Sequence, residues 1–225
     1  MDGYDAALHL LDRQVVDREG QLVAKVDDVE LTLEPDGSLV ATGLLVGLPA
    51  LLPRFGDRLG SWLLDKYVQA GEERADRALP GVIEFELVDD IGSGVELSVL
   101  RKGLVRPRTA EVPAGVERWR LGDLLGMRVR CGDLPKRSRV LDVRLAGVPH
   151  RTERPLVTGL VVGPGRPGSL FGYDRKPDLG PLAVAVVVRR LHRHVRGVDV
   201  GPGVEIDRAA NEVRISPGVP LLPLL

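Results

Sequence analysis

The chain of 225 residues has almost no cysteine, since Cys131 is the only one. A single thiol excludes an intramolecular disulfide and any zinc site built from several cysteines. Sequences without disulfides are typical of reducing compartments. We therefore expect a cytoplasmic protein.

The chain also lacks a large net charge and a long apolar run. The formal net charge of −1 gives no global field that attracts nucleic acid or anionic lipid, although a local patch stays open. The longest uncharged run, LVATGLLVGLPALLP at 39–53, is shorter than the ~20 apolar residues that span a bilayer. The opening MDGYDAALHLLDR has neither the basic segment nor the apolar core of a signal peptide. We predict no transmembrane segment and consider nucleic acid an unfavoured partner. Peripheral association with a membrane stays an open alternative.

Aromatic residues are scarce at 4%, whereas glycine and proline are abundant, with 27 and 17 residues. Many turn residues between short alternating runs of Val and Leu are typical of β-sandwiches and β-barrels. The composition therefore favours a mainly β fold.

Three short stretches occur twice in the same order. VDDVEL at 26–31 returns as VLDVRL at 140–145, TGLLVG at 42–47 as TGLVVG at 158–163, and DIGSGVEL at 90–97 as DVGPGVEI at 199–206. The nearly constant spacing indicates duplication of a unit of about a hundred residues. We predict a first domain over 1–102, a linker over 103–118, a second domain over 119–216 and an apolar tail over 217–225.

The first unit is predicted to hold five strands and one helix. Alternating hydrophobicity and turn signals place the strands at 13–17, 21–33, 39–47, 82–87 and 95–100. The apolar face changes sides between Val26 and Val29, which predicts a β-bulge near Asp27 and Asp28. A helix is predicted over 55–75, with an apolar face made of Leu59, Trp62, Leu63, Tyr67 and Ala70.

The second unit repeats this order, with strands near 127–131, 138–146 and 155–163 and a helix over 181–195. A small sheet must curl to bury one face without leaving open edges. We therefore expect two tandem small β-barrels, each with a helix between the third and fourth strands that plugs an open end. The Gly pairs of DIGSGVEL and DVGPGVEI are expected to serve turns with positive φ, because a strand and not a helix follows them.

The ordered motifs of the first unit resemble the PRC-barrel domain. They are the hairpin from Val15 to Val29, the GLLVG strand, a helix and the closing DIGSGVEL. This fold forms the cytoplasmic part of the photosynthetic reaction-centre H subunit and the C-terminal part of the ribosome maturation factor RimM. The resemblance covers roughly residues 8–100, with a degenerate copy over about 119–216. It implies a non-catalytic interaction module and supplies no catalytic residues to carry over.

The acidic stretch with Asp17, Asp27, Asp28 and Glu30 is either a cation site or ordinary polar strand positions. Clustered carboxylates suit hard cations, but Asp27 points away from Asp28 and Glu30 on a regular strand. The second copy replaces the trio at 27, 28 and 30 with Leu141, Asp142 and Arg144. We favour a solvated strand face with a bulge, and no metal.

Two further groups could bind ligands. His192 and His194 could share a metal on a strand, but they diverge on the predicted helix. We favour a basic helix end there, and its arginines are the best electropositive patch: Arg189, Arg190, Arg193 and Arg196. The apolar tail could dock on a partner or on another copy, pack on its own domain, or fray, through Leu221, Leu222, Leu224 and Leu225.

The sequence favours a non-enzymatic cytoplasmic adaptor or assembly module without catalytic residues or cofactor. Its partner is an unidentified protein, and homo-oligomerisation stays open. The alternative is a ribosome- or RNA-associated maturation factor that uses the arginine patch, although no aromatic residues are interleaved for base stacking. A metal-dependent enzyme or sensor is the third hypothesis, and no nucleophile motif supports it.

Overall fold

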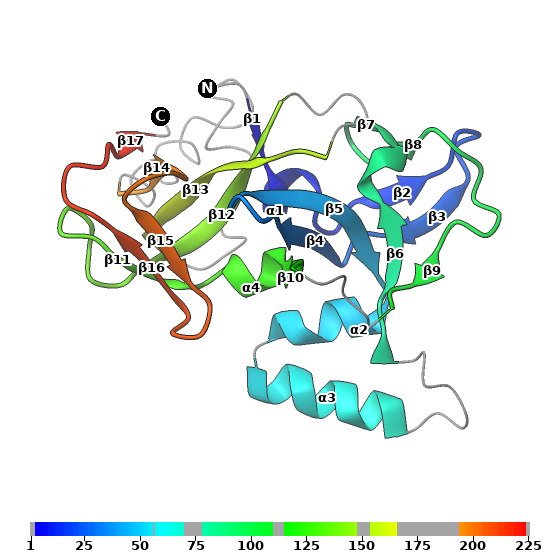
Figure 1. Ribbon diagram of the computed structural model, residues 1–225. Helices are drawn as coiled ribbons and strands as arrows, with labels where there is room; N and C mark the ends of the chain where they lie inside the picture. Colours follow the sequence, from blue (N-terminus) through cyan, green and yellow to red (C-terminus); the bar gives the residue numbers. More distant parts are fainter. Residues whose placement is uncertain are drawn as a thin grey trace, which may run out of the picture.

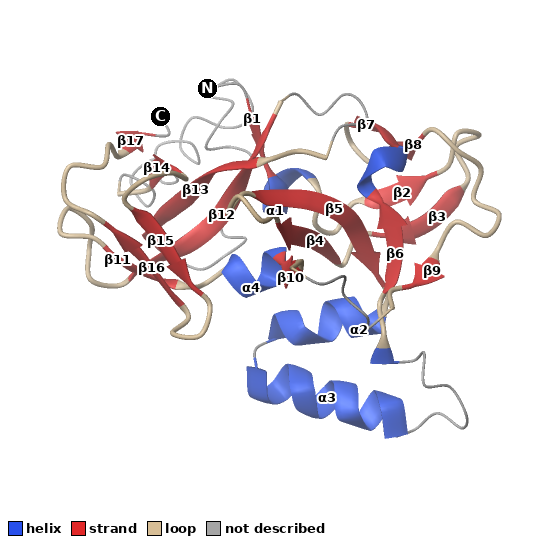
Figure 2. Cartoon of the chain, in the orientation of Figure 1, coloured by secondary structure: helices blue, strands red, loops and turns tan. Residues whose placement is uncertain are grey.

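The computed structural model describes residues 3–55, 57–69, 78–109, 115–147, 154–165 and 194–223. The described chain is mainly β, as the sequence predicted, with short helices beside three sheets (Figures 1 and 2). The strands are β1 (Gly3–Asp5), β2 (Gln14–Val16), β3 (Leu22–Lys25), β4 (Asp28–Leu33), β5 (Leu39–Val46), β6 (Gly81–Glu84), β7 (Val88–Ile91), β8 (Val95–Leu97), β9 (Arg106–Pro107), β10 (Glu117–Arg120), β11 (Arg128–Arg130), β12 (Ser138–Ala146), β13 (Val157–Pro164), β14 (Arg196–Asp199), β15 (Val204–Asp207), β16 (Glu212–Ile215) and β17 (Leu222–Pro223). The helices are α1 (Ala6–His9), α2 (Leu48–Leu51), η1 (Leu52–Phe55), α3 (Asp57–Gln69), η3 (Phe85–Leu87) and α4 (Leu121–Leu124).

The two halves of the chain use the same strand order. The second half forms one sheet in the order β15-β16-β11-β12-β13-β14-β17, with β1 added to β12. The first half spreads the matching order over two sheets, β3-β2-β8-β7 and β10-β4-β5-β6-β9. The pairs β2–β8 and β11–β16 are both parallel. The duplication inferred from the sequence thus has a counterpart in the fold.

The third sequence match, between DIGSGVEL and DVGPGVEI, is wrong as a structural alignment. It equates β8 with β15, but Val95 of β8 pairs with Val15, and the equivalent partner of Val129 is Val213 of β16. A short alternating strand resembles any other short alternating strand, so the local pattern could not identify the partner.

Each half of the chain lends its first strand and helix to the other half. β1 pairs with β12, and α1 packs on the same strand. In the matching exchange, β10 pairs with β4 and α4 packs on β4. The predicted linker, 103–118, contains β9, which pairs with β6, and the first residues of β10. The two halves are therefore intertwined.

The hydrophobic core is continuous across both halves. It joins Leu10 of the first half to Leu145 and Leu160 of the second, and Leu124 of the second half to Leu31 of the first. The halves also meet where the backbone N–H of Ala41 donates to the carbonyl of Pro155 at 2.9 Å. Burial of this shared core is the main stabilising contribution to the arrangement.

The predicted hairpin strand at 21–33 is broken into two strands. β3 pairs with β2 in one sheet, and β4 pairs with β5 in another. The change of apolar face between Val26 and Val29 thus marks a change of sheet, whereas the register shift on β4 falls between Glu30 and Leu31. The bulge predicted near Asp27 and Asp28 was wrong. None of the three sheets closes into a barrel within the described residues.

The first predicted helix is confirmed as α3, but it does not plug a barrel. It packs against η1 and lies away from the sheets (Figure 1). Gly60 is required at this contact, since a Cβ there would come within 2.4 Å of the carbonyl oxygen of Leu52. The predicted apolar face is largely uncovered: Leu59 is 54% exposed and Trp62 is 55% exposed. The second predicted helix, 181–195, lies outside the described residues except for its last two.

The turn predicted at Gly92 and Gly94 is confirmed as the link between β7 and β8. Neither glycine has the positive φ that we expected. Gly94 instead permits a close approach, because a Cβ there would lie 3.0 Å from the carbonyl oxygen of Gln14. No helix in the described part of the chain is long and apolar enough to cross a bilayer.

Candidate functional sites

The acidic residues of the opening hairpin are buried, contrary to the solvated strand face that we predicted. Asp27, Asp28 and Glu30 have exposed fractions of 8%, 1% and 3%. A buried carboxylate needs hydrogen bonds or a counter-charge. Each of the three has partners that are distant in the sequence, and each therefore has its own structural explanation.

Glu30 forms a buried ion pair with Arg108. The Nε of Arg108 donates to Oε2 at 2.8 Å, and its Nη2 donates to Oε1. Thr42 also donates to Oε1 at 2.9 Å, and Arg118 lies 3.8 Å from Oε2. This two-pronged pairing attaches the segment after β9 to β4 and satisfies the Glu30 carboxylate.

Asp142 receives the strand and helix that the first half lends to the second. Its Oδ1 accepts hydrogen bonds from the backbone N–H of Ala7 and of Val143, both at 2.7 Å. Its Oδ2 accepts from the N–H of Leu8 at 3.2 Å. Despite these bonds, burial raises the pKa of Asp142 to about 6. Both carboxylate oxygens thus accept hydrogen bonds from backbone N–H groups, either of the exchanged helix α1 or of the next residue on β12.

Asp28 is the equivalent residue in the first half, with one difference. Its Oδ1 accepts from the N–H of Val29 at 2.8 Å and from the N–H of Gly122 at 3.1 Å. Within the described part of the chain, Oδ2 accepts no hydrogen bond. Burial raises the pKa of Asp28 to about 6 in spite of the two N–H donors. One oxygen of this buried carboxylate is therefore left for another partner.

Stability is expected to fall as the pH rises from about 4 to about 6. The folded pKa values of Asp28 and Asp142 are about 6, above the ordinary 3.8, so the unfolded chain releases these protons first. Each carboxyl then lowers the unfolding free energy by roughly 3 kcal/mol above pH 6, at about 1.4 kcal/mol per pH unit. Urea denaturation across this range measures the effect.

The double variant Asp28→Asn/Asp142→Asn should lose most of this pH dependence. The exposed Asp133→Asn serves as the matched control and should keep it. The pKa of Asp12 is lowered chiefly by its hydrogen bond from Lys25, so its stabilising contribution is complete above pH 3.8 and is lost only as the pH falls below that value. Asp12 therefore does not affect the change expected between pH 4 and 6. An unfolding free energy that rises between pH 4 and 6 in the wild type would contradict this explanation.

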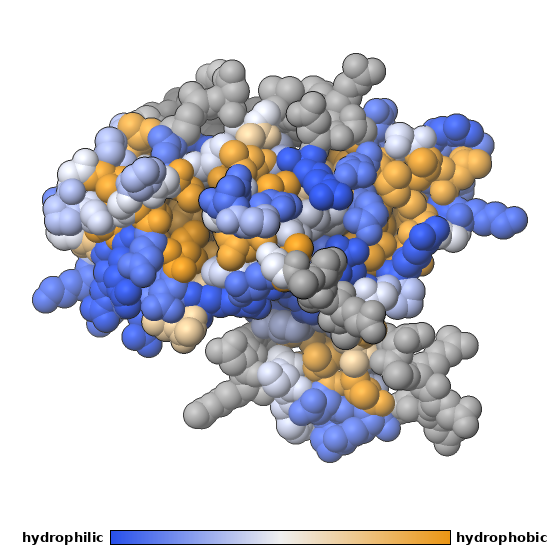
Figure 3. Space-filling view, viewed as in Figure 1, coloured by the Kyte–Doolittle hydropathy of each residue, from blue (hydrophilic) through white to orange (hydrophobic). Residues whose placement is uncertain are grey.

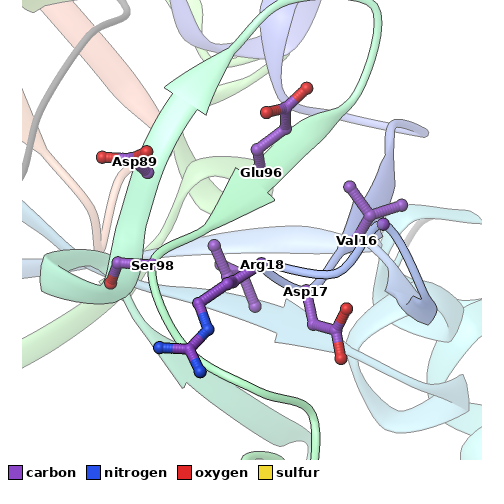
Figure 4. Close-up of a pocket in the computed structure, with 8 residues that line it drawn as sticks. Val16, Asp17, Arg18, Asp89, Glu96 and Ser98 are labelled. Atoms are coloured by element: carbon purple, nitrogen blue, oxygen red, sulfur yellow. The ribbon is translucent and has the colours of Figure 1, made fainter.

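Asp17 lies beside a hollow of about 340 Å³ at the edge of the β2–β8 sheet. Figure 4 shows that the carboxylates of Asp17, Asp89 and Glu96 point away from one another. Burial alone would raise the pKa of Asp17, but N–H donors of Gln21, Arg101 and Glu19 outweigh it and lower the value. These bonds close the hairpin turn and attach it to the segment after β8. The residues do not converge on a common point.

The predicted basic patch can be located only in part. Arg189, Arg190 and Arg193 lie outside the described residues, as does His192. Arg196 begins β14, and its Nη1 donates to the carbonyl of Val195. It therefore belongs to a strand and not to the predicted helix end.

The apolar tail contacts its own chain. Leu221 packs against the core, and Leu222 in β17 pairs with Gly197 of β14. For these two residues, packing on their own chain is thus the alternative that the structure shows, with β17 as a short added strand. Leu224 and Leu225 lie outside the described residues.

Within the described residues, no three His, Cys, Asp or Glu side chains are grouped so that they could hold a metal ion. Cys131 is half-buried and packs against the core. The acidic trio therefore gives no cation site of the kind that the sequence raised.

One feature was not predicted from the sequence, an apolar arm made of α2, η1 and α3. Its uncovered side chains are Leu48, Leu59 and Trp62. Figure 3 shows apolar residues gathered on this arm, below the sheets. The helical spacing of Leu59 and Trp62 identified one face of α3, but only the structure shows that the face has no covering within the described residues.

Comparisons with known proteins give no family. No protein-family model matches the chain, and no curated protein matches its sequence. The resemblance to the PRC-barrel domain accordingly stays a prediction.

Proposed function

We propose that this protein is a non-enzymatic interaction module that docks on a partner protein through the apolar arm. The observation that carries this proposal is the exposure of Trp62 and Leu59, more than half each, on a helix held away from the sheets. Tryptophan is enriched among the residues that dominate binding energy at protein interfaces. Large apolar side chains gathered on one face are also unusual on a surface without a binding role.

The composition of α3 defines the chemistry of the partner. Asp65, Lys66 and Gln69 are exposed on the same helix, one or two turns beyond Leu59 and Trp62. An apolar centre bordered by polar residues is the usual arrangement of an interface. The partner is therefore a protein with an apolar groove that accepts Trp62 and has a polar border. The contact at Gly60 holds α3 in place and lowers the entropic cost of docking.

We also propose that the two halves are PRC-barrel-like units. The shared strand order, with a parallel pair in each half, supports this relationship. The open sheets and the exchanged first strands depart from two separate closed barrels. Such a pair of units is a scaffold, and the apolar arm holds the helix expected between the third and fourth strands, here between β5 and β6.

Trp62→Ala is expected to abolish partner capture without unfolding the protein. Lys66, on the same exposed face, is replaced by a photo-crosslinking residue in the full chain, and crosslinks are made in the native host. The yield of each reproducibly crosslinked protein should fall roughly tenfold or more with Trp62→Ala, because a central aromatic side chain contributes about 1.4 kcal/mol or more to binding. The unfolding free energy should change by less than about 0.5 kcal/mol, since Trp62 is exposed.

Leu22→Ser is the matched control, because Leu22 is 57% exposed on β3, outside the arm. It should leave crosslinking unchanged. Equal crosslinking by wild type and Trp62→Ala would contradict the proposal. Loss of the crosslinks after ribonuclease treatment would instead favour the ribosome- or RNA-associated alternative, and crosslinks only between copies of the chain would favour a homo-oligomer.

A further inference from the structure

A cleft of about 430 Å³ lies where the exchanged segment β10–α4 meets η1 and the β15–β16 hairpin. Figure 1 shows α4 between that hairpin and α2. Its volume falls within the usual range for small-molecule sites. The cleft is distinct from the exposed face of α3, and its lining is strongly polar: Asp28, Arg54, Arg120, Asp123, Arg208 and Asn211.

The positive charge of the cleft is only partly neutralised. Arg208 is paired with Asp123 at 2.7 Å and also with Glu117. Arg54 has a long ion pair of 3.6 Å with Asp12. Arg120 forms no ion pair with a carboxylate in the described part of the chain, and its Nη1 donates to the carbonyl of Pro49. Arg54 and Arg120 therefore keep guanidinium donors available to an anion.

Asp28 adds a carboxylate oxygen to the same cleft. The residue is 1% exposed, and Oδ2 accepts no hydrogen bond from any described residue, whereas the equivalent oxygen of Asp142 binds the N–H of Leu8. In its protonated form, Oδ2 would donate a hydrogen bond to a bound oxygen atom.

Gly122 keeps this part of the cleft open. A Cβ at this position would come within 2.9 Å of Asp28 Oδ2 and 3.7 Å of the Arg54 side chain. The equivalent residue in the other half is Ala7, whose N–H binds Asp142 as the N–H of Gly122 binds Asp28. The two equivalent contacts thus differ: Asp142 Oδ2 is bound by the N–H of Leu8, whereas Asp28 Oδ2 lies beside Gly122, which has no Cβ to cover it.

We propose that this cleft binds the phosphate group of a small molecule, with Arg54 and Arg120 as the charged donors and Asp28 Oδ2 as a third contact. Guanidinium groups pair with phosphate through parallel hydrogen bonds and tolerate close burial. Leu125 and Met127 line the remaining wall, which suits a short apolar portion of the ligand. The ligand class is therefore a small organic phosphate.

Binding is coupled to protonation of Asp28. The charged groups that face it are Arg120 from β10, Arg54 from η1, Asp123 from α4, Arg208 from the β15–β16 hairpin and Asp27 from its own segment. An anion beside Asp28 disfavours the ionised carboxylate, so binding should take up a proton. Affinity is therefore expected to be higher at pH 5 than at pH 7.5, by roughly tenfold.

Calorimetric titration of the full chain with inorganic phosphate, at constant ionic strength with chloride as the balancing anion, tests the site. Arg120→Gln and Gly122→Ala should each weaken phosphate binding by roughly tenfold. The exposed Arg128→Gln is the matched control and should bind as the wild type does. Circular dichroism checks that each variant is folded, and Arg54→Gln replaces any variant that is not.

The pH effect is measured with sulfate, which keeps its charge over this range. In Asp28→Asn, the side-chain amide supplies a permanent donor, so sulfate affinity should no longer depend on pH. The absence of saturable phosphate binding, or equal affinity in Arg120→Gln, Gly122→Ala and the wild type, would overturn the proposal. Equal affinity for acetate would overturn the assignment to phosphate.

Discussion

Arg108→Ala is expected to lower the unfolding free energy by about 3–5 kcal/mol at neutral pH. The substitution leaves the carboxylate of Glu30, which is 3% exposed, without its two-pronged partner. Arg118 lies 3.8 Å from Glu30 and compensates only in part, since it makes no direct hydrogen bond there at normal length. Urea denaturation monitored by circular dichroism measures the loss.

Arg106→Ala is the matched control for this prediction. Arg106 is exposed on β9 and pairs with Val82 through its backbone, so its removal should cost less than about 0.5 kcal/mol. Arg108→Ala should also cost much less in a Glu30→Gln background, where no buried charge is left behind. Similar losses for Arg108→Ala and Arg106→Ala would show that the ion pair contributes little.

Asp142→Ala is expected to lower the unfolding free energy by about 2–4 kcal/mol and to loosen the N-terminal segment. It leaves the backbone N–H groups of Ala7, Leu8 and Val143 without their acceptor inside the protein. Each buried N–H without a partner costs about 1–3 kcal/mol, and loss of the buried charge recovers part of that cost. Hydrogen exchange at Ala7 and Leu8 should accelerate together with the fall in stability.

Asp142→Asn separates the hydrogen bonds from the charge. Asparagine keeps an acceptor oxygen for Ala7 and Val143 and removes the charge that burial disfavours, so the unfolding free energy at pH 7 should be equal to or above that of the wild type. The exposed Asp133→Ala should change neither stability nor exchange at Ala7. If Ala7 and Leu8 stay protected in Asp142→Ala, the exchanged segment is held by its apolar contacts alone.

The two buried aspartates occupy equivalent positions in the two halves but have different partners. Asp142 uses both carboxylate oxygens to hold the exchanged segment, whereas Asp28 uses one. The stability predictions and the proposed phosphate site therefore depend on different atoms of equivalent residues. Asp28→Asn should remove the pH dependence of ligand binding, while Asp142→Asn should leave it unchanged.

The candidate sites could be predicted from the sequence only in part. The amphipathic pattern placed Leu59 and Trp62 on one face of a helix, and α3 confirms the helix. Their exposure depends on where the helix packs, which the pattern does not contain. The cleft joins Arg54, Arg120 and Arg208, which are far apart in the chain. Arginine is ordinarily a surface residue, so no local signal distinguished these three.

The mainly β class and the positions of most strands could be predicted from local sequence patterns alone. Val and Leu alternation and turn residues act over a few residues, and β12 begins and ends at the predicted residues 138 and 146. The exchange of β1 and β10, the burial of the three carboxylates and the open sheets depend on contacts between distant segments: Asp28, Glu30 and Asp142 are all buried by such contacts. The physical reason is that a carboxylate is buried only where distant N–H groups or a guanidinium satisfy it, as Gly122 does for Asp28.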